Sequence, residues 1–240
     1  MMKKYIILFI LLLGVIPASL LAEETFAIND VLKKSAASYD KVNDYTCVFS
    51  KRELVKGSII EENNIVYKFM KPLCIYMKWT EGSNKGNEAI YIQGKFNNKL
   101  QVHLGGLFNI ANFSLDPKGS MAMKENRHSI NEGGIGYIID LIKQNVALYL
   151  NNSGGAITYK GRQALDGRDT LLFEAEFPEG RGYYGHRMLI NIDSKTYLPV
   201  KTEIYGWQDE FLEQYYYSQL RINPGLTDKD FDLHNPEYKF

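Results

Sequence analysis

The chain has 240 residues, with 28 basic and 28 acidic side chains and a formal net charge of zero. No long block of one charge sign interrupts it, which argues against a nucleic-acid-binding protein and against an acidic interaction tail. Apolar residues make up 45% of the chain and aromatic residues 13%, which is ample material for strands and for an apolar interior. The length suits one β-rich domain or two small ones.

The N-terminal residues have the layout of a secretory signal peptide. Lys3 and Lys4 precede an apolar run over residues 5–16, and Ala22 stands at the expected cleavage site. The run is shorter than a membrane-spanning helix, which needs about 20 apolar residues, and no cysteine lies near the cleavage site to receive a lipid. The sequence therefore predicts a signal peptide at 1–22 and a single mature domain at 23–240. It predicts a periplasmic protein, exported through the inner membrane, that is neither an integral membrane protein nor lipid-anchored.

The mature part is predicted to open with an amphipathic helix and to continue with a five-stranded antiparallel meander. Apolar residues recur at three- and four-residue steps from Ile28 to Val42, which predicts a helix of about four turns that ends near Asn43. Gly57 is expected to take a positive φ in the turn between the first two strands. Alternating side chains and turn residues predict strands within 45–54, 64–71, 73–82, 88–94 and 99–106.

The two cysteines, Cys47 and Cys74, fall in the first and third of these strands. An exported protein could bridge them. If the second strand lies between them, however, they are two strand spacings apart, on the order of 9–10 Å, whereas a disulfide needs Cα atoms within about 7 Å. Cys74 also points away from the face that carries Ile75 and Met77. The sequence therefore predicts two free, mostly buried thiols.

The second half of the chain is predicted to contain a long irregular segment, a helix and further strands. Residues 106–134 are expected to be irregular and to lead into a helix over 135–150, so that 106–150 forms a loop-and-helix insertion. Strands are then expected within 156–161, 169–177, 186–193, 198–206 and 211–222. The expected fold is mainly β, of the α+β class, with two or more helices and about ten to eleven antiparallel strands in one large curved sheet.

Three segments resemble the LolA-like superfamily of periplasmic lipoprotein carriers. The stretch INIDSKTYLPVKTEIY (190–205) is similar to a strand–turn–strand of that superfamily, and LTDKDFDLHNP (226–236) is similar to its ending. The stretch KFMKPLCIYMKW (68–79) resembles its strand–Arg/Lys-Pro–strand corner. Together, KPLCIYMKW and SLDPKGSMAMKENRHSI look like one uncharacterised bacterial branch of the superfamily, a domain of unknown function. The resemblance covers nearly the whole mature chain.

This resemblance implies a half-open antiparallel β-barrel covered by helices, with an apolar cavity that takes acyl chains. In the carriers an arginine at the Arg-Pro corner helps to hold the lid helices closed; the matching position here is Lys71, which lacks the planar hydrogen-bonding fork of arginine. If the barrel were filled instead, the same apolar side chains would be ordinary core. The residues expected to line the cavity are Tyr67, Phe69, Leu73, Ile75, Met77 and Trp79.

The segment 114–136 combines many charged residues with glycines and a proline, and it has two interpretations. In the first it is structural, with SLDPKG as a turn and with Arg127 and His128 bound to backbone carbonyls or to Glu132. In the second it is a rim or lid of the cavity, where Lys71, Arg127 and His128 meet a lipid headgroup or the carboxylates of a partner.

Catalytic and metal sites find little support in the sequence. Asp116, His128 and Glu132 are candidates for an acid/base set, with Ser114, Ser120 or Ser129 as the nucleophile, but no G-x-S-x-G motif accompanies them. No histidine has a partner at zinc-ligand spacing. We therefore predict no catalytic residue, no metal ligand and no cofactor. The four histidines stand singly at His103, His128, His186 and His234.

The sequence thus predicts an exported lipid- or lipoprotein-binding protein of the cell envelope that holds acyl chains in an apolar barrel cavity. The expected partner is a lipid or an acylated protein, with an envelope membrane protein as a further candidate, and nucleic acid is not expected. Two alternatives stay open. One is a structural or interaction module whose barrel is filled and whose segment 106–134 is a docking surface. The other is a hydrolase that uses the His128 region.

Overall fold

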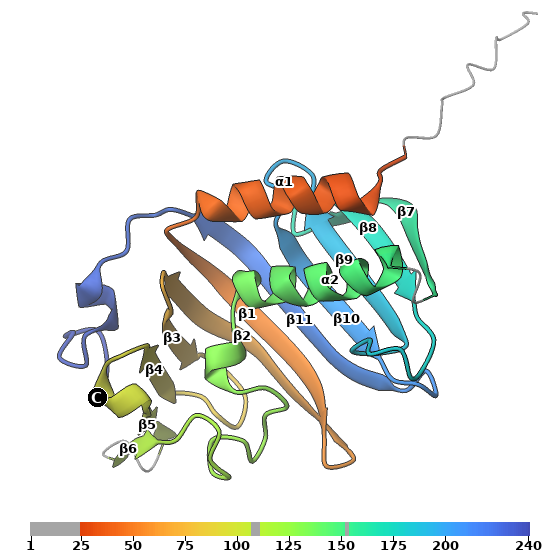
Figure 1. Ribbon diagram of the computed structural model, residues 1–240. Coiled ribbons are helices and arrows are strands. Elements are labelled where there is room, and N and C mark those ends of the chain that lie inside the picture. The colour runs from red at the N-terminus through yellow and green to blue at the C-terminus, as the bar shows by residue number, and fades with distance from the viewer. Residues whose placement is uncertain (1–24, 107–110, 152–153) are drawn as a thin grey trace, which may run out of the picture.

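The computed structural model describes residues 25–106, 111–151 and 154–240 (Figure 1). The predicted signal peptide at 1–22 lies outside the described residues. Two α-helices, α1 (Ile28–Asp40) and α2 (Ile135–Leu150), accompany an eleven-stranded sheet in which all pairs are antiparallel. In the part of the chain that is described, no helix is both long and apolar enough to cross a membrane.

The sheet has the strand order β6-β5-β4-β3-β2-β1-β11-β10-β9-β8-β7. The chain runs outward from β1 to the edge strand β6, and it returns from the opposite edge, β7, inward to β11. The two halves meet where β1 pairs with β11, with Phe49 opposite Tyr217 and Lys51 opposite Tyr215. The strands are β1 (Asp44–Val55), β2 (Ser58–Met70), β3 (Cys74–Trp79), β4 (Glu88–Ile92), β5 (Leu100–Leu104), β6 (Ala111–Leu115), β7 (Ala156–Leu165), β8 (Arg168–Glu176), β9 (Arg187–Asp193), β10 (Pro199–Tyr205) and β11 (Phe211–Ile222).

The mainly β, antiparallel fold and the second helix are as predicted, but one strand was missed. Residues 106–134 were expected to be irregular throughout, and this is wrong at Ala111–Leu115, which form β6 and pair with β5. Three consecutive residues of β6 are exposed, so the strand lacks the alternation that identifies a half-buried strand. Strand β2 also begins at Ser58 rather than at Asn64.

The two thiols are free and buried, as predicted. Strand β2 separates Cys47 on β1 from Cys74 on β3, and the two cysteines belong to different apolar clusters. Cys74 lies in the cluster on the outer face of the sheet, where the C-terminal residues contribute Phe231 and Tyr238. The Tyr238 ring stacks on Tyr76 with 4.1 Å between centroids, so the C-terminal segment covers the outer face of β3 and β4.

Helix α2 covers the inner face of the second half of the sheet (Figure 1). Its apolar stripe, with Ile135 and Ile139 almost fully buried, packs in one core with residues of β8 and β9 such as Phe173. Helix α1 lies beside it, and Gly136 permits this approach because a Cβ there would come within 2.4 Å of the Tyr39 hydroxyl. The first half of the sheet, β1–β6, is left for a different covering segment.

Candidate functional site

The segment that joins β6 to α2 provides that cover, and we call residues 116–134 the strap. It contains a short 3₁₀ helix, η3 (Ile130–Glu132), and its side chains Ala122 and Ile130 pack against the main core. At its end the N–H of Ile135 donates to the Tyr45 hydroxyl at 3.1 Å, which ties the start of α2 to β1. The strap therefore lies against the inner face of the sheet.

A cavity of about 620 Å³ lies between the strap and the inner face of β1–β6. This volume is within the range of small-molecule sites, about 300–1,000 Å³. The wall is largely aliphatic and aromatic, whereas Asn84, Lys124, Glu125 and Asn126 contribute polar groups. The sheet side chains that line it include Phe49, Tyr67, Ile75, Met77, Trp79, Ala89, Leu100, Val102, Leu104, Phe113, Leu115, Tyr215 and Tyr217.

The structure places four of the six predicted lining residues in this wall, namely Tyr67, Ile75, Met77 and Trp79. Phe69 does not reach the cavity: its ring stacks on Tyr45 with 4.8 Å between centroids and lies under the start of α2. Leu73 lies in the loop before β3 and packs against the core. The structure therefore places these two side chains in packed core, outside the cavity wall.

Lys71 does not lie in the cavity wall. Its Nζ donates to the Tyr39 carbonyl at 2.7 Å and lies 4.4 Å from the centroid of the Tyr39 ring. A cation suits this place because the last carbonyls of α1 carry partial negative charge. In this structure the corner lysine therefore binds α1 by a single hydrogen bond and a cation–π contact.

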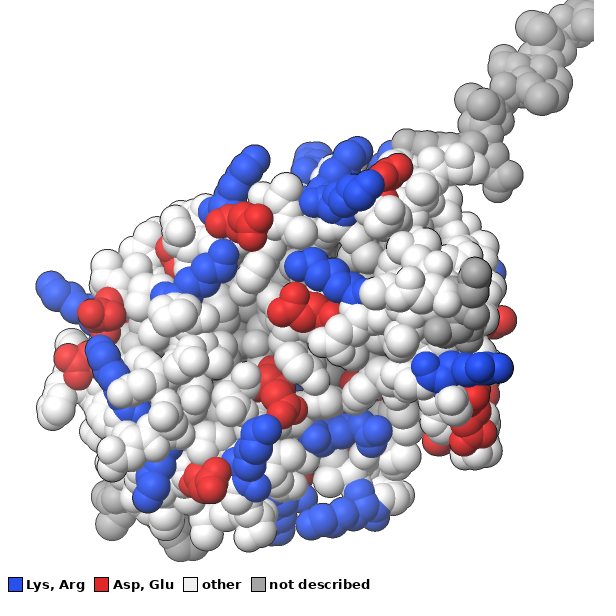
Figure 2. Space-filling view, in the orientation of Figure 1, with Lys and Arg blue, Asp and Glu red and all other residues white. Residues whose placement is uncertain are grey.

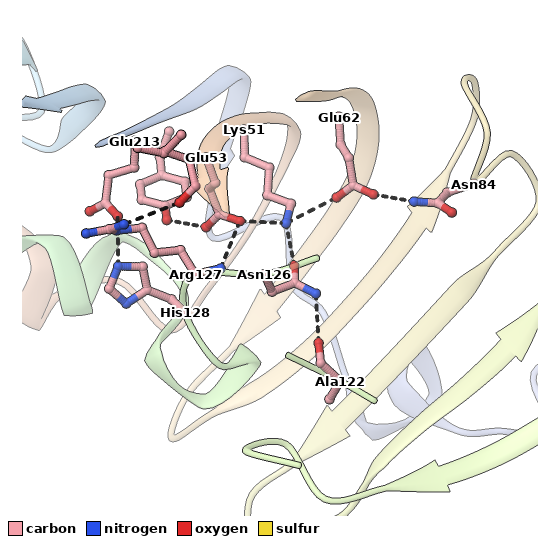
Figure 3. Close-up of polar contacts among 11 residues, drawn as sticks. Lys51, Glu53, Glu62, Asn84, Ala122, Asn126, Arg127, His128 and Glu213 are labelled. Carbon is pink, nitrogen blue, oxygen red and sulfur yellow. Dashed lines mark hydrogen bonds and ion pairs between the residues drawn. The ribbon is translucent and has the colours of Figure 1, made fainter. Parts of the chain in front are cut away.

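A row of buried charges crosses β2, β1 and β11 at one end of the cavity (Figure 3). Lys51 is only 4% exposed and Glu53 only 1%, so both must be paired. The Lys51 ammonium lies 2.9 Å from Glu53 and 3.2 Å from Glu62, and it donates to the side-chain carbonyl of Asn126 on the strap. Asn126 in turn donates to the Ala122 carbonyl, which fixes this part of the strap.

The next two residues of the strap bind the same row at Glu53 and Glu213. The backbone N–H of Arg127 donates to Glu53 at 3.2 Å, and the Arg127 Nε lies 2.9 Å from the Glu213 carboxylate. The Nε2 of His128 lies 2.9 Å from Glu213, which also accepts the Tyr184 hydroxyl at 3.1 Å. Glu213 is 1% exposed, so three groups from outside β11 converge on one buried carboxylate.

These contacts favour a positive charge on His128. The row contains the carboxylates of Glu53, Glu62 and Glu213 against two permanent cations, Lys51 and Arg127, so it is neutral only when the imidazole is protonated. Burial by itself would lower the pKa of His128, but the hydrogen bond and charge of Glu213, with smaller contributions from Glu132 and Glu53, outweigh it and raise the pKa above the ordinary 6.5. Contact of the strap with Glu213 and Glu132 therefore favours the imidazolium form of His128.

This arrangement predicts a pH-dependent stability. Because the pKa is raised on folding, His128 stabilises the protein fully below pH about 6.5, and the contribution is lost as the pH rises through the folded-state pKa. We expect His128→Asn to lower the free energy of unfolding by about 1.5–3 kcal/mol in mildly acid solution and by less at pH about 9. Urea unfolding of both proteins over this range measures the difference. A difference that does not change with pH would contradict the charged state.

The same contacts bear on catalysis. Both ring nitrogens of His128 face carboxylates, Nε2 that of Glu213 and Nδ1 that of Glu132 at 3.3 Å, and the hydroxyl of Ser129 donates to the Pro117 carbonyl. In this arrangement neither ring nitrogen of His128 contacts the Ser129 hydroxyl, as a nucleophile–base pair would need. Of the acid/base candidates, the structure brings His128 and Glu132 together, whereas Asp116 accepts the backbone N–H of Lys118 within its own turn.

The other histidines lie at separate places. His103 contacts Asn112 between β5 and β6, His186 contacts the Phe177 carbonyl, and His234 contacts Asp232 in the C-terminal segment. Sequence reasoning missed the charged row itself. A signal for it exists: Lys51 and Glu53 continue the inward alternation of Cys47 and Phe49, and a charge at an inward position of a strand needs a partner.

Comparison with known proteins bears on the fold. No curated protein matches the chain. Among solved structures, the lipoprotein LppX of Mycobacterium tuberculosis is 13% identical, with 86% of this chain and 100% of that chain covered and a TM-score of 0.50. A putative outer membrane lipoprotein-sorting protein domain from Vibrio parahaemolyticus is 10% identical, with coverage of 86% and 97% and a TM-score of 0.36. A LolA superfamily protein from Nitrosomonas europaea is 12% identical, with coverage of 87% and 98% and a TM-score of 0.33.

At these identities the similarity to LppX concerns the fold, and it agrees with the resemblance visible in the sequence. A family model described as "Protein of unknown function (DUF1571)" matches residues 42–240, from the end of the first helix to the last residue. The chain therefore belongs to this family, and its fold is LolA-like.

Proposed function

We propose that this protein is an exported, envelope-located carrier or binding protein for a lipid or for the acyl chains of a lipoprotein. The observation that carries the proposal is the cavity of about 620 Å³ on the inner face of β1–β6. Tyr67, Ile75, Met77 and Trp79 are the proposed contacts of the acyl chains. Each CH₂ group that leaves water for such a surface contributes about 0.8 kcal/mol, so a chain of several CH₂ groups supplies binding energy without a specific polar contact.

The proposal includes the parts of the prediction that concern the whole chain. Residues 1–22 are the signal peptide that directs export, residues 23–240 are the mature domain, and the envelope is the place of action. The lipoprotein LppX shares the general architecture. This similarity supports the fold, and the cavity of this chain is the proposed site of lipid binding.

Within this proposal Arg127 and His128 hold the strap rather than the headgroup. Both side chains already bind Glu213, and Arg127 also donates to the Leu54 carbonyl at 3.3 Å. A headgroup that displaced them would leave a buried carboxylate without a partner, which is costly. The headgroup is instead expected near Asn84, Lys124 and Glu125, polar residues of the cavity wall, because Lys124 and Glu125 are exposed to solvent.

Uptake of an apolar fluorescent probe tests the proposal. The folded mature protein should bind such a probe with saturation, and a phospholipid or an acylated peptide should displace it. An interaction module whose barrel is filled would show no saturable uptake, and it would be expected to copurify with a protein instead. If the probe is bound only after the protein has been unfolded, the carrier proposal is wrong.

A further inference from the structure

Two exposed apolar side chains lie at the cavity. Five large apolar side chains are exposed in the described part of the chain: Ile59 at 44%, Phe96 at 40%, Phe113 at 39%, Met121 at 64% and Leu150 at 54%. Two of these, Phe113 and Met121, also belong to the cavity wall. Single exposed apolar residues are ordinary on a protein surface, but two that continue a cavity wall into solvent mark its mouth.

The local structure fixes the backbone at Phe113 and close to Met121. Phe113 lies on the edge strand β6 opposite Val102 of β5, and Val102 packs against the main core. Met121 follows a turn that is closed by two hydrogen bonds, from the backbone N–H of Lys118 to the Asp116 carboxylate and from that of Gly119 to the Asp116 carbonyl, both at 2.9 Å. An ordered turn therefore exposes Met121 to solvent, although contact of its apolar side chain with water is unfavourable.

The charges beside this mouth include two exposed lysines. The side chains of Lys118 and Lys124 are 66% and 74% exposed, and they flank Met121 in the sequence. Lys118 lies 3.1 Å from Glu132, and Lys124 lies 3.9 Å from Glu125. Such exposed pairs contribute little and exchange readily for other partners. Acidic and basic side chains alternate over the face that carries α2 and the strap (Figure 2).

We infer that Phe113 and Met121 insert into the surface of a lipid bilayer when the cavity is loaded or emptied, while Lys118 and Lys124 contact lipid phosphates. This inference rests on the proposed function and names the partner surface. An acyl chain that moves from a bilayer to the cavity must stay out of water. Apolar side chains that belong both to the cavity wall and to the exterior give the acyl chain such a path. Lysines beside an apolar tip suit the interface, because their stems lie along apolar surface while the ammonium reaches the phosphates.

Vesicle flotation with the mature protein tests the inference. The vesicles are made of phosphatidylcholine and phosphatidylglycerol, and the variants are Phe113→Asp and Met121→Asp. Each should lower the fraction of protein that floats with the vesicles by about tenfold, because a buried methionine or phenylalanine is replaced by a charge at the interface. The matched control is Leu150→Asp, since Leu150 is 54% exposed but is not part of the cavity wall. It should float like the wild type.

Two comparisons separate this inference from the proposed function. In solution without vesicles, Lys118→Gln should take up the apolar probe as the wild type does, because Lys118 is not part of the cavity wall. It should extract labelled phospholipid from vesicles about five times more slowly, the loss expected for one lysine at an anionic lipid surface. The docking inference is overturned if Met121→Asp floats as well as the wild type, or if Met121→Asp and Leu150→Asp lose flotation to the same extent. In either case, probe uptake would still support a carrier. Flotation that requires a membrane protein in the vesicles would also overturn it. If the wild type takes up no apolar probe, the proposed carrier function is wrong.

Discussion

Replacement of Glu213 by alanine is expected to destabilise the protein by about 3–5 kcal/mol, the cost of breaking a buried charge pair from one side. The carboxylate is 1% exposed and accepts from Tyr184 while it faces Arg127 and His128. Without it, the charges of these two strap residues lose their shared partner. Urea unfolding near pH 6 measures the free energy, and hydrogen exchange of strap amides should show faster local opening at residues 122–129.

Two variants serve as controls for this experiment. Glu213→Gln keeps an acceptor of the same shape and removes the charge, so its loss of stability should lie between those of wild type and Glu213→Ala. Glu179→Ala removes an exposed loop carboxylate and should change the stability by less than about 0.5 kcal/mol. If Glu213→Ala unfolds within 1 kcal/mol of the wild type, on the order of one ordinary hydrogen bond, the charged row does not hold the strap.

The second large effect is expected from filling the cavity at Ala89. This residue lies on β4 between Met77 of β3 and Val102 of β5, and its side chain is part of the cavity wall. A phenylalanine there would extend into open space, so Ala89→Phe should cost less than about 1 kcal/mol of stability, below the usual cost of overpacking. It should weaken binding of the apolar probe by tenfold or more, because it takes the place of at least about two CH₂ groups of the ligand.

The matched control is Ala164→Phe, the same substitution at an exposed position of β7. It should leave both stability and probe affinity close to those of the wild type. Equal probe affinity in the two variants would show that the probe binds elsewhere. A large loss of stability in Ala89→Phe alone would show instead that the space beside Ala89 closes up in solution.

The parts of the fold that follow from local patterns were predictable. Helix α2 occupies 135–150 as predicted, because Ile135, Ile139 and Ile142 recur on one face of a helix and a glycine pair precedes them. The free thiols were also predictable, because a meander places β2 between Cys47 and Cys74. Both inferences need only neighbouring residues and the geometry of one helix or of two successive hairpins.

The site depended on contacts that no local pattern contains. Lys51 and Asn126 are 75 residues apart, and His128 and Glu213 are 85 residues apart, yet these pairs attach the strap to the sheet. Strand β6 was missed because its exposed residues do not alternate. Phe69 was predicted to line the cavity because it lies two residues from Tyr67 and therefore on the same face of β2. Alternation identifies that face, but it does not reveal where along the face packed core ends and the cavity begins.

The direct test of a lipid-binding cavity is native mass spectrometry of the protein purified from the cells that make it. The account predicts a population with additional mass that is released as lipid or acylated peptide when the protein is unfolded. It also predicts that this population decreases in Ala89→Phe and not in Ala164→Phe. A protein that has only its own mass, and that takes up no added phospholipid, would contradict the account and favour an interaction module of the envelope.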